Sequence, residues 1–422
     1  MTALRDNFID KRSLDNVLFS PERSEPIGFI LRLAKALHTY GVPAYELEKI
    51  ISLVASRLGF GIQCMSLPTS ISLTFMHEDN EYQTFVTRVA PGEINLEKLR
   101  RVTQTAQSVI DKEISPKDGA KQLKQVEQLA ENFGGLVLML AVACFSAALA
   151  RILGGGVTEI WVSALAGLSL GALINLTKYF LFLGSVLPTI AAFSVSVISF
   201  GLANFLGGFA TSITIVAGLI VLLPGLTLTI AMAELATQNL VSGTARLTGS
   251  GIVFLQLGLG LLLGNTFREM IGWEMMSFEV NPLPEVSQWI ALIIASGALI
   301  VPFNARLKDA GWMIIAGVVA FGTSTFMNFY TAPSSAAFVG AIAVGITARW
   351  VNKQFSIPGA FILLPGILLL VPGSIGFRSI QSLVDHQVVD AFETAFEMAI
   401  IGLSLVSGLL ISSMTRFQPI KT

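Results

Sequence analysis

Two Pro-Gly pairs interrupt apolar runs of this chain, and polar residues follow each of them. Pro224-Gly225 stands in the run IVLLPGLTLTIAMAE, and Pro372-Gly373 stands in the run LLLVPGSIGFRSIQS, 148 residues later. In lipid, such breaks are tolerated only where the freed backbone groups face protein or a water-filled cavity. Corresponding interrupted segments in two halves of a chain are typical of a transporter's binding site. The alternative is a pair of proline kinks that serve packing alone.

Hydroxyl side chains lie close to both breaks. Thr227 and Thr229 follow the first break, and Ser374 follows the second. At an exposed helix end, N–H groups attract anions and carbonyl groups attract cations. These positions could therefore hold a zwitterion without a full protein charge. The alternative is that each hydroxyl bonds to the preceding turn of its own helix.

The apolar runs of the chain contain few ionisable residues, and four of them are candidates for a function. Glu234 closes the first interrupted run, Arg378 follows the second break, and Glu393 and Glu397 lie one helical turn apart in the last apolar run. Such a group at the bilayer centre costs about 2.5 kcal/mol or more and usually serves a function. Arg378 is a candidate partner for a substrate carboxylate, and the three glutamates are candidates for proton coupling. The alternative is that all four reach water at the headgroup level.

The elements that must position these residues are membrane helices. The chain of 422 residues is 53% hydrophobic and only 13% charged, its mean hydropathy is +0.70, and its charges concentrate before Gly135. Ten apolar runs then approach the length of about 20 residues that a bilayer crossing requires. We predict spans near 136–153, 159–177, 185–206, 212–233, 245–264, 287–303, 311–329, 335–350, 358–381 and 391–414.

The basic residues between these spans predict the orientation. Positive charge accumulates in cytoplasmic connections, and alternate connections differ in their Lys and Arg content. We therefore expect both termini in the cytoplasm of a cell whose inner (plasma) membrane holds the protein. One side holds Lys178, Arg246, Arg306, Lys308, Arg349, Lys353, Arg416 and Lys421, whereas the other holds Arg151, Arg268 and Arg378.

The repeated break predicts an internal repeat. Two equivalent sets of five spans require the second set to be inverted relative to the first, because each set contains an odd number of crossings. Inverted repeats are characteristic of secondary transporters. We expect an all-α membrane transporter of about ten helices, with halves at 136–264 and 287–422 joined by an external loop at 265–286.

The first third of the chain predicts a small cytoplasmic α+β domain at 25–135, after a flexible arm at 1–24. Two amphipathic helices meet at a Gly-Val-Pro turn, and two more follow, with Asn95 as an N-cap and Pro116 in a first turn. Between the pairs of helices we expect three antiparallel strands, near Gly61–Ser66, Ser70–Met76 and Tyr82–Val89.

Several function classes lack support in the sequence. No G-x-x-x-x-G-K-[ST] phosphate loop is present, no basic stripe indicates a nucleic-acid partner at a net charge of −1, and we expect no cofactor and no metal. Cys64 and Cys144 lie in different regions, so a disulfide is not expected. The turn His77-Glu78-Asp79 has metal-binding side chains, but a solvated hairpin explains it better. Glycine-rich spans permit packing within one subunit or in a homo-oligomer.

Two stretches resemble the threonine/serine exporter family. LRLAKALHTYGVPAYELEKIISLVASRLG is similar to the start of its cytoplasmic domain, and LLPGLTLTIAMAELATQNLVSGTARL is similar to its best-marked membrane motif. The order of cytoplasmic domain, five spans and five more spans is similar to the fused members. The matching residues are Gly41, Pro43, Leu47, Glu48, Leu58 and Gly59 in the first stretch, and Pro224, Gly225, Ser242, Gly243, Arg246 and Leu247 in the second.

The resemblance implies proton-driven export of small hydrophilic metabolites, with threonine and serine first and dicarboxylates such as succinate as the alternative. Our hypothesis from the residues is a substrate site between the two breaks, where Thr227, Thr229 and Ser374 contact substrate and Arg378 contacts its carboxylate, with Glu234 as the first candidate to carry protons. A membrane-anchored enzyme and a metabolite sensor that acts through the first domain stay open as other functions. No nucleophile stands beside a base in that domain, which favours a transporter over an enzyme.

Overall fold

The computed structural model describes residues 25–76, 82–274, 281, 283–355, 357–370, 373–384 and 386–414. The chain divides into two compact units, Met1–Ala130 and Glu131–Thr422. The predicted arm at 1–24, the turn at His77–Asp79 and the candidate site residue Pro372 lie outside the described residues. The finer division of the membrane region stays a prediction.

The first unit contains the predicted three-stranded sheet. Its strands β1 (Gly61–Leu67), β2 (Ser70–Met76) and β3 (Tyr82–Arg88) pair antiparallel in sequence order. In β2, alternate side chains are buried, including Phe75, whose ring meets Phe85 edge to face. The strand period of two therefore gives the sheet one inward face.

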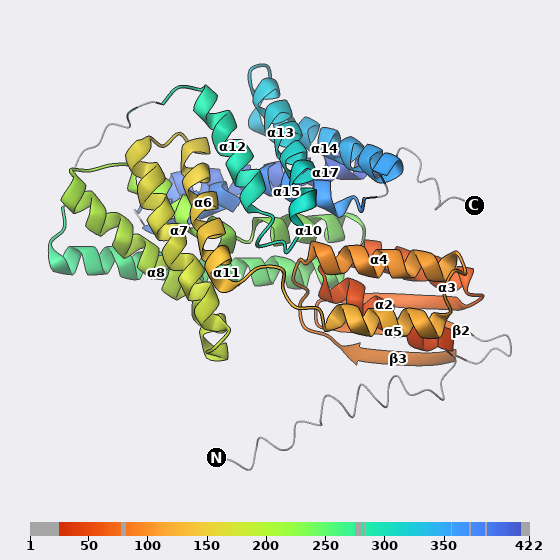
Figure 1. Cartoon of the computed structure of the whole chain (residues 1–422). Coiled ribbons are helices and arrows are strands. Elements are labelled where there is room, and N and C mark those ends of the chain that lie inside the picture. Colours follow the sequence, from red (N-terminus) through yellow and green to blue (C-terminus); the bar gives the residue numbers. More distant parts are fainter. Residues whose placement is uncertain are drawn as a thin grey trace, which may run out of the picture. The chain divides into compact units, whose positions relative to one another are not determined.

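Four helices complete this unit: α2 (Glu25–Thr39), α3 (Ala44–Arg57), α4 (Leu96–Ile110) and α5 (Pro116–Glu127). They pack on one another, and α2 and α3 also contact β2 and β1 (Figure 1). The predicted cap is confirmed, because Asn95 Oδ1 accepts a hydrogen bond from Lys98 N at 3.0 Å. The Glu48 carboxylate accepts one from Ser66 N at 2.9 Å and so connects α3 to β1.

The second unit is helical throughout its described residues. Its first half contains α6 (Gly135–Ile152), α7 (Val157–Thr177), α8 (Leu181–Leu206), α9 (Thr211–Leu219), the 3-10 turn η1 (Ile220–Leu222), α10 (Gly225–Ala236) and α11 (Leu240–Ile271). Its second half contains α12 (Val286–Ala298), η2 (Leu307–Asp309), α13 (Ala310–Asn328), α14 (Pro333–Phe355), α15 (Ala360–Leu370), α16 (Gly373–Val384) and α17 (Val388–Met414).

Ten crossings are not confirmed. Among the described residues, eight helices are long and apolar enough to cross a membrane, or nine if the bent pair Thr211–Leu222 and Gly225–Ala236 forms one span. The sixth predicted span, 287–303, contains only the 13-residue helix α12. Pro302 lacks an N–H and restricts the residue before it, so the apolar residues after Ala298 form turns instead of more helix.

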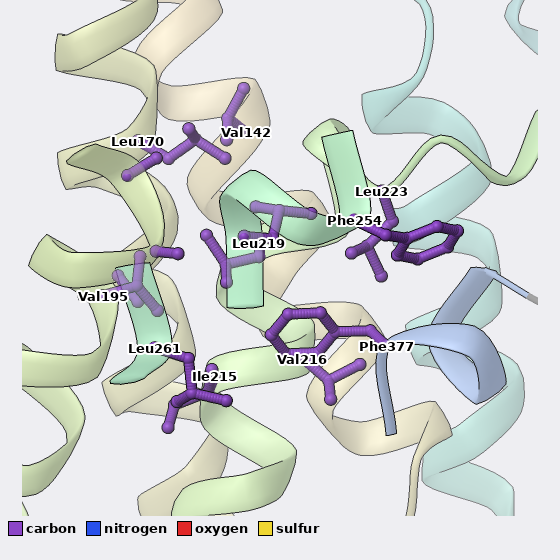
Figure 2. Packing of buried hydrophobic residues seen from close by; sticks show 14 of the residues in the cluster. Val142, Leu170, Val195, Ile215, Val216, Leu219, Leu223, Phe254, Leu261 and Phe377 are labelled. Atoms are coloured by element: carbon purple, nitrogen blue, oxygen red, sulfur yellow. The ribbon is translucent and has the colours of Figure 1, made fainter. Parts of the chain in front are cut away.

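The core of the first half includes a residue of the second. Phe377 of α16 is fully buried and belongs to the cluster that contains Leu219, Leu223 and Phe254. Figure 2 shows its ring among these side chains. The two halves therefore share one hydrophobic core at this place.

The environment of Cys64 on β1 gives a prediction about pH. Burial, and secondarily the negative charge of Glu48, raises the pKa of the Cys64 thiol to about 12. An ordinary thiol has a pKa of about 8.5, and only the thiolate is nucleophilic. In a Cys144→Ala variant, alkylation of Cys64 should therefore rise about tenfold with each pH unit through pH 9 without levelling. A plateau between pH 8 and 9 would contradict this assignment.

Candidate functional site at two helix breaks

The first predicted break is present and sharp. After η1, Leu223 is extended, Pro224 precedes the new helix, and α10 begins at Gly225. The axes of the two segments differ by 58°. Proline cannot donate the hydrogen bond that would continue the helix. The first-turn N–H groups of α10 consequently have no carbonyl partner within their own helix.

The structure brings the two breaks together. Gly373, the first residue of α16, is buried against Gly225, the first residue of α10. A Cβ on Gly373 would lie 3.2 Å from Gly225 Cα and 3.4 Å from Gly225 N. The start of α10 therefore lies against the first described residue of α16, and the dipole of α10 favours a negative group there.

The predicted hydroxyl residues differ in their surroundings. Thr229 is buried, and its Oγ1 donates a hydrogen bond to Gly225 O, 3.1 Å away in the preceding turn. The Thr229 hydroxyl therefore bonds to the preceding turn of its own helix, as the alternative interpretation of the sequence expected. Its oxygen can still accept a hydrogen bond from another group. Thr227 is exposed and Ser374 is half-buried.

Glu234 is fully buried near the end of α10 and pairs with Arg246 of α11. Arg246 Nε lies 3.1 Å from Oε2 and 3.2 Å from Oε1, and the arginine side chain is only 14% exposed. Nine residues separate Glu234 from Gly225, which is about 14 Å along a helix. The ion pair and the crossing of the breaks are therefore two separate places on α10.

Arg246 was not among the predicted site residues. The sequence does show a glutamate and an arginine twelve positions apart across a short turn, which is compatible with an ion pair. Whether they meet depends on how closely the two helices approach. Gly243 provides that approach, since a Cβ there would lie 2.9 Å from Ala231 O. One turn later along α11, Arg246 reaches Glu234.

The other charged candidates lie on the surface of this unit. Arg378 on α16 and Glu393 and Glu397 on α17 are exposed, and their side chains make no ion pair within the described part of the chain. Across those same residues, no group of three His, Cys, Asp or Glu side chains is placed to hold a metal ion.

Two family models, both described as threonine/serine exporters, match the chain at residues 28–267 and 288–415. The chain belongs to the threonine/serine exporter family. With its long apolar helices it is a multi-pass membrane protein, and the family is one of exporters and not of enzymes.

The identities to individual relatives are below 30%. The chain is 29% identical over 343 residues to the threonine/serine exporter of Corynebacterium glutamicum, covering 75% of this chain and 66% of the relative. It is 24% identical over 370 residues to pheromone-regulated membrane protein 10 of Eremothecium gossypii, covering 83% and 48%. The corresponding protein of Candida albicans is 25% identical over 365 residues, covering 83% and 33%. The chain thus spans between a third and two thirds of these relatives' lengths, and no solved structure matches it significantly.

The close approach of Gly373 to Gly225 predicts that two glycine substitutions will change the stability of the protein unequally. Gly373→Ala should lower the free energy of unfolding by about 1–3 kcal/mol, because the new methyl group presses on the backbone of Gly225. Gly249→Ala on α11 is the control, since no atom lies within 4 Å of its added Cβ. Thermal unfolding in detergent measures both, and equal effects would show that the close approach is not strict.

Proposed function

We propose that this protein exports small amino acids, with threonine and serine as the first candidates, in exchange for protons. The contact between Gly225 and Gly373 carries the proposal. Two helix N-termini at one point can bind a substrate carboxylate, while the carbonyl ends of the preceding segments can accept from its ammonium group. In this proposal Pro224, Thr227, Thr229 and Ser374 line the site on the two broken segments, together with Pro372.

Arg378 is proposed as a second partner for the substrate carboxylate. It lies five residues after Gly373 and is exposed, so it is positioned to meet substrate on entry or exit. Succinate and similar dicarboxylates are the second candidate substrate class, because converging N-termini favour any carboxylate.

An inverted repeat supports alternating access. Ser146 of α6 packs against Gly167 of α7, and 150 residues later Ser296 of α12 packs against Gly317 of α13. The helix contacts repeat as well: α8 packs on α11 as α14 packs on α17, and α10 packs on α17 as α16 packs on α11. We infer two inverted five-element halves that rock about the crossing, with the inner (plasma) membrane as the location and both termini cytoplasmic.

Further glycine contacts recur at nearly the same spacing. Gly260 meets Ala192, and Gly408 meets Ala341. These positions lie on α11 and α8 in the first half and on α17 and α14 in the second. Equivalent packing of this kind supports the proposed repeat.

Counterflow in proteoliposomes tests the substrate. Vesicles preloaded with threonine, serine or succinate should take up the labelled compound, and a proton gradient should change the rate. Exchange of threonine and serine supports the proposal, and exchange of succinate alone assigns the second substrate class. Absence of exchange with all three would reject the function.

The proposed proton carrier is Glu234, with Glu393 and Glu397 as the other candidates. Glu234→Gln keeps the size of the side chain but cannot be ionised, so gradient-driven flux should be lost. Flux is measured over a range of pH in the same vesicles. Full pH-dependent transport by the variant would exclude Glu234 from the mechanism.

A further inference from the structure

We propose that Glu234 and Arg246 form a proton-responsive contact that closes the α10–α11 turn when Glu234 is ionised and opens it when Glu234 is protonated. This inference rests on the proposed function and assigns Arg246 as a positioning residue for it. The pair joins two helices across a three-residue turn, and both side chains are largely removed from solvent.

The second half of the chain contains a matching turn without the Glu–Arg ion pair. Helix α16 ends 148 residues after α10 ends, and α17 begins 148 residues after α11 begins. Gln238 and His386, also 148 apart, both have positive φ, at 67° and 61°. Asn239 N donates to Glu234 O, and Gln387 N donates to Ser382 O, each at 2.8 Å.

This correspondence identifies the counterparts of the ion pair. Ser382 corresponds to Glu234, and Thr394 corresponds to Arg246. Thr394 donates its hydroxyl within its own helix, to Asp390 O at 2.8 Å. The turn in the second half is instead joined by Ser379 Oγ, which donates to Ala391 O at 2.6 Å.

The architecture therefore does not require a buried ion pair at this turn. The second half builds a matching backbone turn with Ser382 and Thr394 in place of the two paired residues, and a buried pair is in general weak support for stability. What the pair adds to the first half is a group that can bind a proton. At the corresponding positions of the second half, Ser382 and Thr394 cannot form such a contact.

The chemistry of opening is a single proton transfer. Hydronium gives its proton to the Glu234 carboxylate and becomes water, and the hydrogen bond from Arg246 Nε to Glu234 Oε1 loses its ionic character. The neutral acid tolerates burial better than the carboxylate, while the guanidinium can move toward water along its aliphatic stem.

Charged groups on the neighbouring elements are few. Helix α15 has none, and on α11 the other charges, Arg268 and Glu269, lie at the opposite end of the helix. The remaining charges on elements packed against α10 are exposed, namely Arg378 of α16 and Asp390, Glu393 and Glu397 of α17.

The test introduces the side chains of Ser382 and Thr394 at the equivalent positions of the first half, as the double variant E234S/R246T. We expect wild-type exchange to change by up to about tenfold per pH unit, as titration of one group requires. The double variant should lose gradient-driven flux, as Glu234→Gln does, and its remaining substrate exchange should vary less than about twofold over the same range. Retention of the wild-type pH profile by this variant would overturn the proposal.

The matched control is an exposed ion pair of the same unit. Lys178 Nζ lies 2.7 Å from Glu131 Oε2, and the two side chains are 45% and 62% exposed. E131S/K178T should leave the pH profile unchanged. An equal loss of pH dependence in this control would show that removal of any ion pair has the effect, and would also overturn the proposal.

A second measurement does not depend on transport. The infrared difference spectrum between low and high pH should show the C=O band of a buried carboxyl in the wild type, and the band should be absent from E234S/R246T. E234D, which keeps a carboxyl, should retain both the band and the pH dependence. If the wild type exchanges no substrate but shows the band, the proposed function fails and this inference stands; a band that persists in the double variant overturns it.

Discussion

The contact between the backbones of Gly225 and Gly373 is the constraint on which the membrane unit depends. Each glycine starts a helix directly after a proline position, so the approach of two chains coincides with the approach of two helix N-termini. A side chain at Gly373 would press on the backbone of Gly225. The absence of side chains thus creates both the geometry and the local positive potential.

The Glu234–Arg246 ion pair and the Gly225–Gly373 contact lie near opposite ends of α10 and have different chemistry. In the proposed mechanism, the contact between Gly225 and Gly373 offers only backbone and hydroxyl groups to a polar substrate, without a permanently buried charge. The charge is placed near the other end of the helix, where Gly243 lets α11 come close enough for Arg246 to neutralise Glu234. Helix α10, of twelve residues, connects the two places, so in the proposed mechanism it carries a movement from one place to the other.

Sequence patterns predicted the features that depend on local chemistry. The sheet, the Asn95 cap and the break at Pro224 follow from strand alternation, capping and the missing proline N–H. Patterns could not predict that Arg246 meets Glu234, because this depends on the distance between two helices. They also overestimated the length of α12, because apolar residues around Pro302 look like membrane helix when only hydropathy is considered.

The position of Phe377 has a consequence for biogenesis. Its ring fills part of the core built by α9, η1 and α11, yet it is synthesised more than one hundred residues after α11 ends. During translation the first half therefore enters the membrane with an unfilled space in its core. Insertion machinery and quality control meet an intermediate that becomes complete only when α16 arrives, so a chain truncated before α16 should be recognised as unfinished and degraded.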